Sequence, residues 1–238
     1  MDLAIVIPVF NEAESIASLL EEIDVVPGLR SGCDIIVVDD GSNDDTAAVL
    51  EACRERYPRL QVLRHAACRG QSAAIVSGVR AAQRAWIATL DGDGQNDPAD
   101  IPRLCDVIRE SPEGLALASG YRRHRHDSWL KRLSSRIANS VRAFVLRDGT
   151  PDTGCGLKVF RRSVFMNLPC FDHMHRFLPA LVQMHGGRVV SVEVRHRERR
   201  RGWSKYGVHN RLWAGIVDLF GLLWLQRRAL PPGDREDN

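Results

Sequence analysis

The chain has 238 residues, 44% of them hydrophobic, which is enough apolar sequence to form one sizeable core. Its 33 basic and 30 acidic residues give a net charge of +3, which excludes bulk binding to nucleic acid through charge alone. The six cysteines form no Cys-x-x-Cys pair, so we expect reduced thiols and no structural zinc. Asp2 and the short apolar run that follows it differ from a signal peptide, and we do not expect secretion.

Apolar runs and helical periodicities alternate along the first half of the chain. The runs predict strands over residues 3–10, 34–38, 60–63 and 86–90. Helices are predicted between them: one that Asn11 caps, one from about Asp44 to Tyr57, and one after the turn at 69–72. Strands that alternate with helices of this length predict an α/β fold with a doubly wound, mostly parallel sheet flanked by helices.

The second half continues this pattern and ends in a separate apolar stretch. We predict helices to about Ser111, over 128–147 and over about 174–185, with strands over 115–119, 157–160 and 188–194. The apolar stretch 212–225 is shorter than the ~20 residues that a membrane-spanning helix needs. It predicts an amphipathic helix at 211–228 that lies in the membrane surface, or that packs against the domain or a partner subunit. The predicted organisation is a domain at 1–210, this helix, and a disordered tail at 229–238.

Two carboxylates follow directly after the predicted strand 86–90. Asp91 and Asp93 are separated by Gly92, which lets the backbone turn tightly, and Gln95 adds an amide oxygen nearby. Carboxylate and amide oxygens suit Mg²⁺ or Mn²⁺, so this stretch predicts a metal ion that holds a diphosphate. A solvated Asp-Gly turn is the plain alternative.

The residues that follow these carboxylates predict a fixed position for them at the sheet edge. Asp97 is expected to cap a helix and Pro98 to occupy its first helical position. Ligands of open α/β sheets bind at this edge, beyond the ends of the strands. The turn at Gly70–Ser72 also fits a phosphate at a helix start, but we interpret it as a tight turn without a catalytic role.

Four segments of the chain together resemble family 2 glycosyltransferases, and within them the dolichol- or polyprenyl-phosphate mannosyltransferase type. They are Ile7-Pro8-Val9-Phe10-Asn11-Glu12, Val38-Asp39-Asp40-Gly41-Ser42, Asp91-Gly92-Asp93-Gly94-Gln95 and Gly202-Trp203-Ser204-Lys205-Tyr206. The resemblance covers most of residues 1–210 and implies a GT-A fold, which the amphipathic helix predicted at 211–228 would follow. It also implies a nucleotide-sugar donor, one Mg²⁺ or Mn²⁺ ion, and inverting transfer to a polyprenyl or dolichyl phosphate at the cytoplasmic, inner face of the cell membrane.

The same resemblance assigns roles to individual residues. The nucleotide-sugar site would comprise Pro8, Phe10, Glu12, Val38, Asp40, Asp91, Gly92, Asp93, Arg122, Arg199 and Lys205. Asp91, Asp93 and Gln95 would bind the metal, and Asp91, Asp93, Arg122, Arg199 and Lys205 would act in catalysis. Phe10 stands where that type usually has tyrosine, which removes a hydroxyl group. Asp39 is interpreted as structural, whereas Asp40 would reach the base.

The chemistry of the reaction agrees with these roles. A departing diphosphate gains negative charge, so a metal ion and the cations Arg199 and Lys205 would stabilise its departure. A lipid monophosphate has its second pKa near ~6 and is largely dianionic at neutral pH, so a dedicated general base is unnecessary. Candidates to bind that acceptor phosphate are Arg122, Lys131, Arg132 and Ser135.

Several other polar residues have competing interpretations. The basic run 195–201 fits a solvated loop or a nucleic-acid patch, but we favour function for Arg199 alone and expect its neighbours to face anionic lipid headgroups. Asp152 either orients Lys158 or an acceptor-site arginine, or forms a simple turn. His173 and His175 are not expected to bind a metal.

The primary hypothesis is a metal-dependent inverting enzyme that moves mannose from GDP-mannose to a polyprenyl phosphate. An alternative of the same class uses a UDP-sugar such as UDP-glucose or UDP-N-acetylglucosamine. A third hypothesis is a catalytically silent module that binds nucleotide sugars or anionic lipid, because a sheet can keep its carboxylates without turnover.

Overall fold

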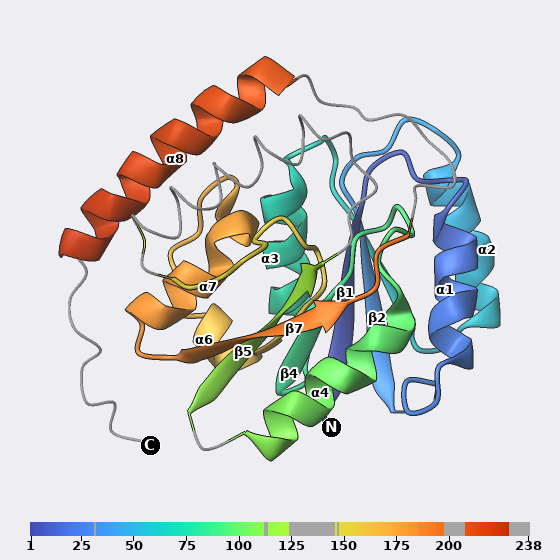
Figure 1. Cartoon of the computed structure of the whole chain (residues 1–238). Coiled ribbons are helices and arrows are strands. Elements are labelled where there is room, and N and C mark those ends of the chain that lie inside the picture. The colour runs from blue at the N-terminus through green and yellow to red at the C-terminus, as the bar shows by residue number, and fades with distance from the viewer. Residues whose placement is uncertain (31, 112–113, 124–145, 147, 198–207, 229–238) are drawn as a thin grey trace.

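The computed structural model describes residues 1–30, 32–111, 114–123, 146, 148–197 and 208–228. At its centre, a seven-stranded sheet has the strand order β3-β2-β1-β4-β6-β5-β7 (Figure 1). The described elements in chain order are β1 (Leu3–Val9), α1 (Ile16–Val25), β2 (Cys33–Asp39), α2 (Thr46–Arg56), β3 (Leu60–Arg64), α3 (Gln71–Ala81), β4 (Trp86–Thr89), the 3₁₀ turn η1 (Pro98–Asp100), α4 (Ile101–Glu110), β5 (Leu115–Arg122), β6 (Lys158–Arg161), α6 (Arg162–Phe165), α7 (Met174–Met184), β7 (Arg188–Val194) and α8 (Val208–Arg228).

The sheet is mixed because one strand runs against its neighbours. β1 pairs in parallel with β2 and β4, β2 pairs in parallel with β3, and β5 pairs in parallel with β7. β6 is antiparallel to both β4 and β5. The segment before β6 crosses the carboxyl end of β4, where the Thr89 hydroxyl donates to the Gly156 carbonyl (2.7 Å), so β6 runs away from that end. The predicted α/β fold with a mostly parallel sheet is confirmed.

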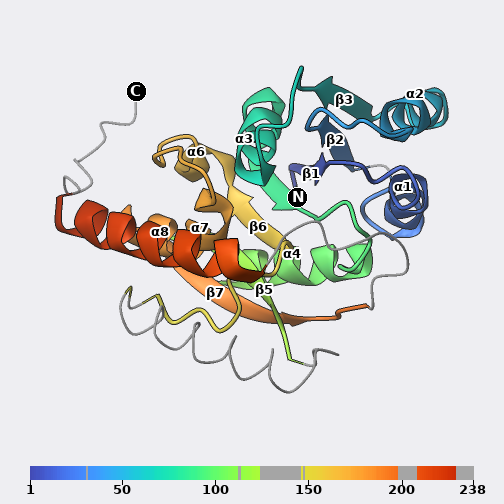
Figure 2. The same cartoon turned by 90° about the horizontal axis from the view of Figure 1, so that it is seen from above.

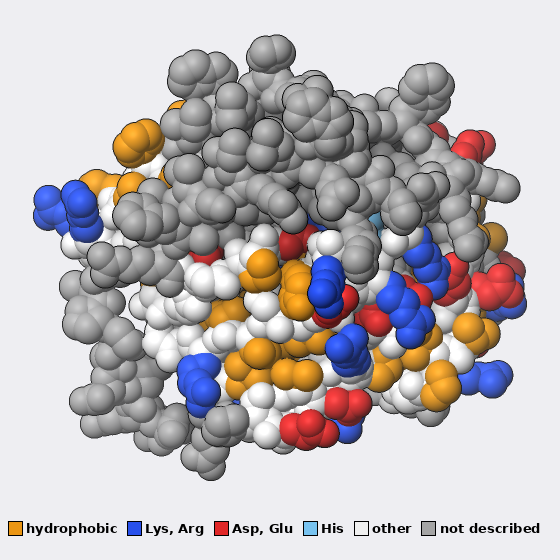
Figure 3. Space-filling model, in the orientation of Figure 1, with side chains coloured by type: hydrophobic (Ala, Val, Ile, Leu, Met, Phe, Trp, Pro, Cys, Tyr) orange, Lys and Arg blue, Asp and Glu red, His pale blue; other side chains and the backbone are white. Residues whose placement is uncertain are grey.

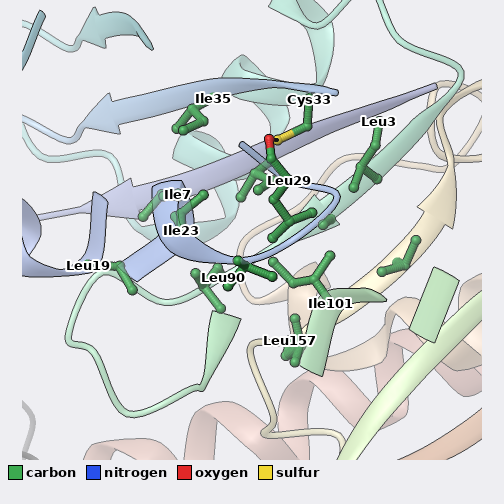
Figure 4. Close-up of a cluster of buried hydrophobic side chains, with 14 of the residues drawn as sticks. Leu3, Ile7, Leu19, Ile23, Leu29, Cys33, Ile35, Leu90, Ile101 and Leu157 are labelled. Carbon is green, nitrogen blue, oxygen red and sulfur yellow. Dashed lines mark hydrogen bonds between the residues drawn. The ribbon is translucent and has the colours of Figure 1, made fainter. Parts of the chain in front are cut away.

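Helices cover both faces of this sheet, and β1 contributes to both cores. All seven β1 residues are buried, as expected for a central strand covered on two sides. Ile5 and Ile7 pack with residues of α1, α2 and α4 in one cluster, part of which Figure 4 shows. Ala4 and Val6 face the other cluster, with residues of α3, α7 and α8. Figure 2 shows these two groups of helices on opposite sides of the strands.

The starts of two helices test the predicted caps. Asp97 caps η1 as predicted, because its carboxylate accepts the Ala99 amide (3.0 Å) and Pro98 occupies the first position. The prediction that Asn11 caps the next helix is wrong, since α1 begins only at Ile16. Asn11 has a left-handed backbone (φ 54°), which a helix N-cap does not adopt, and its side-chain amide donates to Asn43 Oδ1 (2.7 Å).

Helix α8 has 21 residues and packs on the face of the sheet that α3 and α7 cover (Figures 1 and 2). Leu222 is only 2% exposed and joins the core, whereas Phe220 and Trp224 are 68% and 65% exposed. Figure 3 shows hydrophobic and basic side chains next to each other over the C-terminal part of α8, at the left. Within the described residues, no helix combines the length and apolar character that crossing a membrane requires.

Candidate functional site

The carboxyl ends of β1, β2 and β4 meet at one edge of the sheet, and the predicted metal-binding stretch begins there. Asp91 follows the end of β4, and the adjacent Leu90 amide donates to the Val6 carbonyl of β1 (3.2 Å). Gly92 lies so close to β1 that a Cβ atom on it would sit 2.6 Å from Val9 Cγ1. A Cβ atom on Gly156 would overlap the Asp91 carboxylate. These two positions therefore require glycine for the carboxylate to occupy its place.

Asp91 is held from two sides and has an altered acidity. The Gln71 amide donates to its Oδ1 (2.9 Å), and the Asn96 amide donates to its Oδ2 (3.4 Å). Burial, and then the negative charge of Asp93, raise the pKa of Asp91 to about 6. The positive charges of Lys158 and Arg122 act in the opposite direction but do not cancel this rise.

The donor set fits a hard divalent cation. A cation placed between the two carboxylates would offset the repulsion that the charge of Asp93 exerts on Asp91. Asp93 Oδ1 already accepts the backbone N–H of Gln95 (3.1 Å). No cluster of three or more His, Cys, Asp or Glu side chains with metal-binding geometry occurs within the described ranges. A cation here would therefore take further ligands from water and from a diphosphate, as Mg²⁺ commonly does. Gln95 as a ligand stays a prediction.

The predicted nucleotide-binding residues lie around the same edge. Pro8 and Val38 are buried in β1 and β2, while Phe10 and Glu12 are partly exposed just beyond β1. The Ser15 hydroxyl is within hydrogen-bond distance of both the Glu12 carboxylate (3.0 Å) and the Gly92 carbonyl (2.9 Å). The structure thus joins the end of β1 to the loop that carries Asp91 and Asp93.

Asp40 has a structural role that the sequence did not predict. Its carboxylate is 3% exposed, pairs with His65 Nδ1 (2.6 Å), and accepts the backbone N–H groups of Arg69 (3.0 Å) and Gly70 (2.7 Å). These bonds fix the segment between β3 and α3. Asp39 accepts the Ser42 amide (2.8 Å), as its structural interpretation requires. A contact between Asp40 and a base stays a prediction.

Arg122, at the end of β5, is fixed by Asp152. Its Nε lies 2.7 Å from Asp152 Oδ2 and its Nη2 lies 3.0 Å from Oδ1, with both side chains largely buried. Burial alone would lower the pKa of Arg122, but the bonds to Asp152 outweigh it and the net shift is upward. Of the competing interpretations of Asp152, the one in which it orients an arginine is the one the contacts support.

The basic segment after β7 is tied to the same loop. Arg195 pairs with Asp97 (3.3 Å), and Arg197 pairs with Asp97 (2.8 Å) and with Glu22 of α1. The Arg197 amide N–H donates to the Gln95 carbonyl (2.9 Å). These ion pairs hold both arginines against the protein, although the side chain of Arg195 is still 71% exposed and that of Arg197 is 30% exposed. The expectation that they face lipid headgroups stays a prediction.

Some predicted site residues lie outside the described residues. They are Arg199, Lys205, Lys131, Arg132 and Ser135, together with most of the helix predicted at 128–147 and the tail at 229–238.

Sequence reasoning missed three residues next to Asp91. The side-chain amides of Gln71 and Asn96 donate hydrogen bonds to its carboxylate. Lys158, which is 4% exposed, donates to the carbonyls of Cys155 and Thr153, and its positive charge acts on the pKa of Asp91. Desolvation lowers the pKa of this buried lysine. Gln71 did carry a signal, because it lies within the turn Gly70–Ser72, which the sequence places at the start of a helix at the sheet edge.

Solved structures share this architecture. Glucosyl-3-phosphoglycerate synthase from Mycobacterium tuberculosis, crystallised with Mn²⁺ and UDP, matches with a TM-score of 0.71 and 18% identity over 97% of this chain and 81% of that one. A mannosyltransferase from Pyrobaculum calidifontis, solved with GDP-mannose and Mn²⁺, matches with a TM-score of 0.69 and 20% identity over 97% and 66%. The fold is the GT-A fold of nucleotide-sugar transferases.

Sequence comparison then identifies the family. Residues 4–168 match the model of glycosyl transferase family 2, and this chain belongs to that family. Dodecaprenyl-phosphate galacturonate synthase from Rhizobium johnstonii is 33% identical over 98% of this chain and 70% of its own length. Undecaprenyl-phosphate 4-deoxy-4-formamido-L-arabinose transferase from Serratia proteamaculans is 35% identical over 86% of this chain, which spans 63% of that relative.

Proposed function

We propose that this chain is an inverting, metal-dependent glycosyltransferase that moves a sugar from a nucleotide sugar to a polyprenyl phosphate. The observation that carries the proposal is the Asp91–Asp93 pair at the carboxyl edge of the sheet in a family 2 chain. The named acceptors of the two relatives, dodecaprenyl and undecaprenyl phosphate, support the same class of acceptor here.

The donor is proposed to be a UDP-sugar. The relatives' names carry galacturonate and a formamido-arabinose, and neither is mannose. These names favour the UDP-sugar alternative over the primary hypothesis of GDP-mannose. Assays with a panel of nucleotide-sugar donors have to determine which sugar is transferred.

The residues of the site would have different roles in the transfer of the sugar. A bound Mg²⁺ or Mn²⁺ ion would supply positive charge to the diphosphate while its bond to the sugar breaks. Asp91 and Asp93 would hold that ion, with Gln95 as a further ligand. Arg122 presents a guanidinium that Asp152 keeps in one orientation, which suits the recognition of a phosphate.

The other cations of the proposed site belong to segments outside the described residues. Arg199 and Lys205 are proposed to close over the diphosphate. The hydrogen bond from the Arg197 backbone N–H to the Gln95 carbonyl supports this, because it holds the chain just before Arg199 next to the loop that carries Asp91 and Asp93. Lys131, Arg132 and Ser135 are proposed to bind the acceptor phosphate together with Arg122. A dianionic acceptor phosphate would attack the sugar without a general base.

The chain is further proposed to act as a peripheral protein at the cytoplasmic face of the cell membrane. Val217, Phe220 and Trp224 form an exposed apolar stripe on α8, at helical spacing. Arg227 and Arg228 follow in its last turn and can attract anionic headgroups. A helix with such a stripe can insert into the headgroup region while its other face stays on the domain.

The test is an incubation of the protein with undecaprenyl phosphate, Mn²⁺ and a panel of UDP- and GDP-sugars, with mass spectrometry of the lipid product. We expect transfer from a UDP-sugar, no transfer with a chelator present, and an inverted anomeric configuration by NMR. Transfer from GDP-mannose alone would restore the mannosyltransferase hypothesis. Binding of donors without transfer from any of them would instead favour the silent binding module.

A further inference from the structure

Gln71 is the one amide side chain among the described residues that reaches Asp91 from a helix. It is the first residue of α3, and its Nε2 donates to Asp91 Oδ1 at 2.9 Å, across 20 residues of sequence. The second amide partner, Asn96, is more distant at 3.4 Å. Gln71 therefore makes the shorter of the two bonds that orient this carboxylate.

The backbone around Gln71 is fixed on both sides. Gly70 before it has a left-handed backbone (φ 91°) and donates its N–H to the buried Asp40 carboxylate. Ser72 after it is buried, and its hydroxyl lies 2.7 Å from His175 Nδ1 at the start of α7. Because this backbone is already fixed, only the rotamer freedom of the side chain is lost when the bond forms, so Gln71 can orient Asp91 although it is itself exposed.

The chemical type of the bond matters as much as its position. An amide donates a hydrogen bond without a formal charge, so Asp91 keeps its full negative charge for a cation. A lysine or arginine at this position would orient the carboxylate but would also neutralise it. Arg122, whose charge acts to lower the pKa of Asp91, is instead paired with Asp152.

We propose that Gln71 is a positioning residue, which holds the Asp91 carboxylate in the orientation that binds the divalent cation and, through it, the donor diphosphate. This inference rests on the proposed function, because it assigns Asp91 to the cation. Partners that orient metal ligands in this way affect metal affinity or activity by roughly 10- to 100-fold when they are removed.

The test compares Gln71→Met, which keeps the length but removes the bond, with Gln71→Lys, which keeps a donor but adds a positive charge. Gln61→Ala is the matched control, since Gln61 is an exposed glutamine on the edge strand β3. Mn²⁺ binding is measured by electron paramagnetic resonance without substrates, and thermal unfolding is recorded without metal. KM for the donor, KM for the lipid and kcat are each measured separately.

We expect Gln71→Met to bind Mn²⁺ about tenfold more weakly than wild type, with an unchanged unfolding temperature and an unchanged KM for the lipid. Gln71→Lys should bind Mn²⁺ more weakly still, and Gln61→Ala should behave as wild type. Wild-type Mn²⁺ affinity in Gln71→Met would overturn the inference, as would a lower unfolding temperature with unchanged Mn²⁺ affinity. A wild-type protein that binds Mn²⁺ but transfers no sugar would refute the proposed function instead, and the Mn²⁺ measurements on the variants would still decide the role of Gln71.

Discussion

Arg122 and Asp152 form a two-pronged ion pair between the end of β5 and the loop before β6, with Nε–Oδ2 and Nη2–Oδ1 distances of 2.7 and 3.0 Å. The Arg122 backbone N–H also donates to Asp152 Oδ2 (3.2 Å). The exposed fractions of the two side chains are 11% and 8%, so neither charge has much access to water. Each partner therefore depends on the other for compensation of its charge.

We predict that Asp152→Ala destabilises the protein by ~3 kcal/mol and lowers kcat strongly, because a buried guanidinium is left without its counter-charge. Asp152→Asn, which keeps the shape, should lose less stability. Urea denaturation and lipid-transfer assays measure the two effects. A wild-type free energy of unfolding in Asp152→Ala would show that Arg122 finds another partner or reaches water.

Asp93 is predicted to be needed for metal binding but not for folding. Asp93→Ala removes one of the two carboxylates, so metal-dependent donor binding should be lost while the unfolding temperature changes little. The same change should lower the pKa of Asp91, since the charge of Asp93 is one of the causes that raise it. Calorimetry with Mn²⁺ and donor measures binding, and undiminished transfer by this variant would reject the metal assignment.

The sequence predicted those features that depend on residues adjacent to one another along the chain. The strand at Leu3–Val9 followed from a continuous apolar run, and the helix start at Asp97 followed from a capping residue before proline. The bond from Gln71 to Asp91 depends instead on how α3 lies against the end of β4, which no local pattern contains.

The sequence also did not predict which residues the charged side chains pair with. The run around Arg197 is recognisably basic in the sequence, but Glu22, the partner of Arg197, lies 175 residues away along the chain. The reversed direction of β6 follows from where its preceding segment crosses β4, which the apolar pattern of the strand does not encode. In both cases the tertiary arrangement decides between interpretations that the sequence leaves open.

Metal binding is predicted to weaken in acid because Asp91 must lose a proton. With a pKa of about 6 in the metal-free protein, Mn²⁺ affinity should be about tenfold lower at pH 5 than at pH 7, and binding at pH 6 should release about half a proton. Calorimetry in two buffers with different ionisation enthalpies measures that release. An affinity that is flat across this range would contradict the raised pKa.

The raised pKa of Asp91 also makes the stability of the metal-free protein depend on pH. The folded pKa of Asp91 lies above its unfolded value near 3.8, so the metal-free folded state binds more protons between about pH 4 and 6. The contribution of this group to stability therefore falls as the pH rises through that range. Saturating Mn²⁺ should reverse the loss, which thermal unfolding with and without the ion at pH 7 can measure.

Changes on opposite faces of α8 should separate the role of the helix in folding from its role in membrane contact. Leu222 is buried in the core with α7, so Leu222→Ala should reduce the free energy of unfolding by ~2–4 kcal/mol. Phe220 and Trp224 are exposed, so changing both to serine should leave stability nearly unchanged. That double variant should nevertheless lose flotation with vesicles rich in phosphatidylglycerol, because the apolar stripe no longer inserts. If the double variant floats as well as wild type, while Leu222→Ala unfolds as predicted, α8 serves to pack the domain and its exposed face does not bind the membrane.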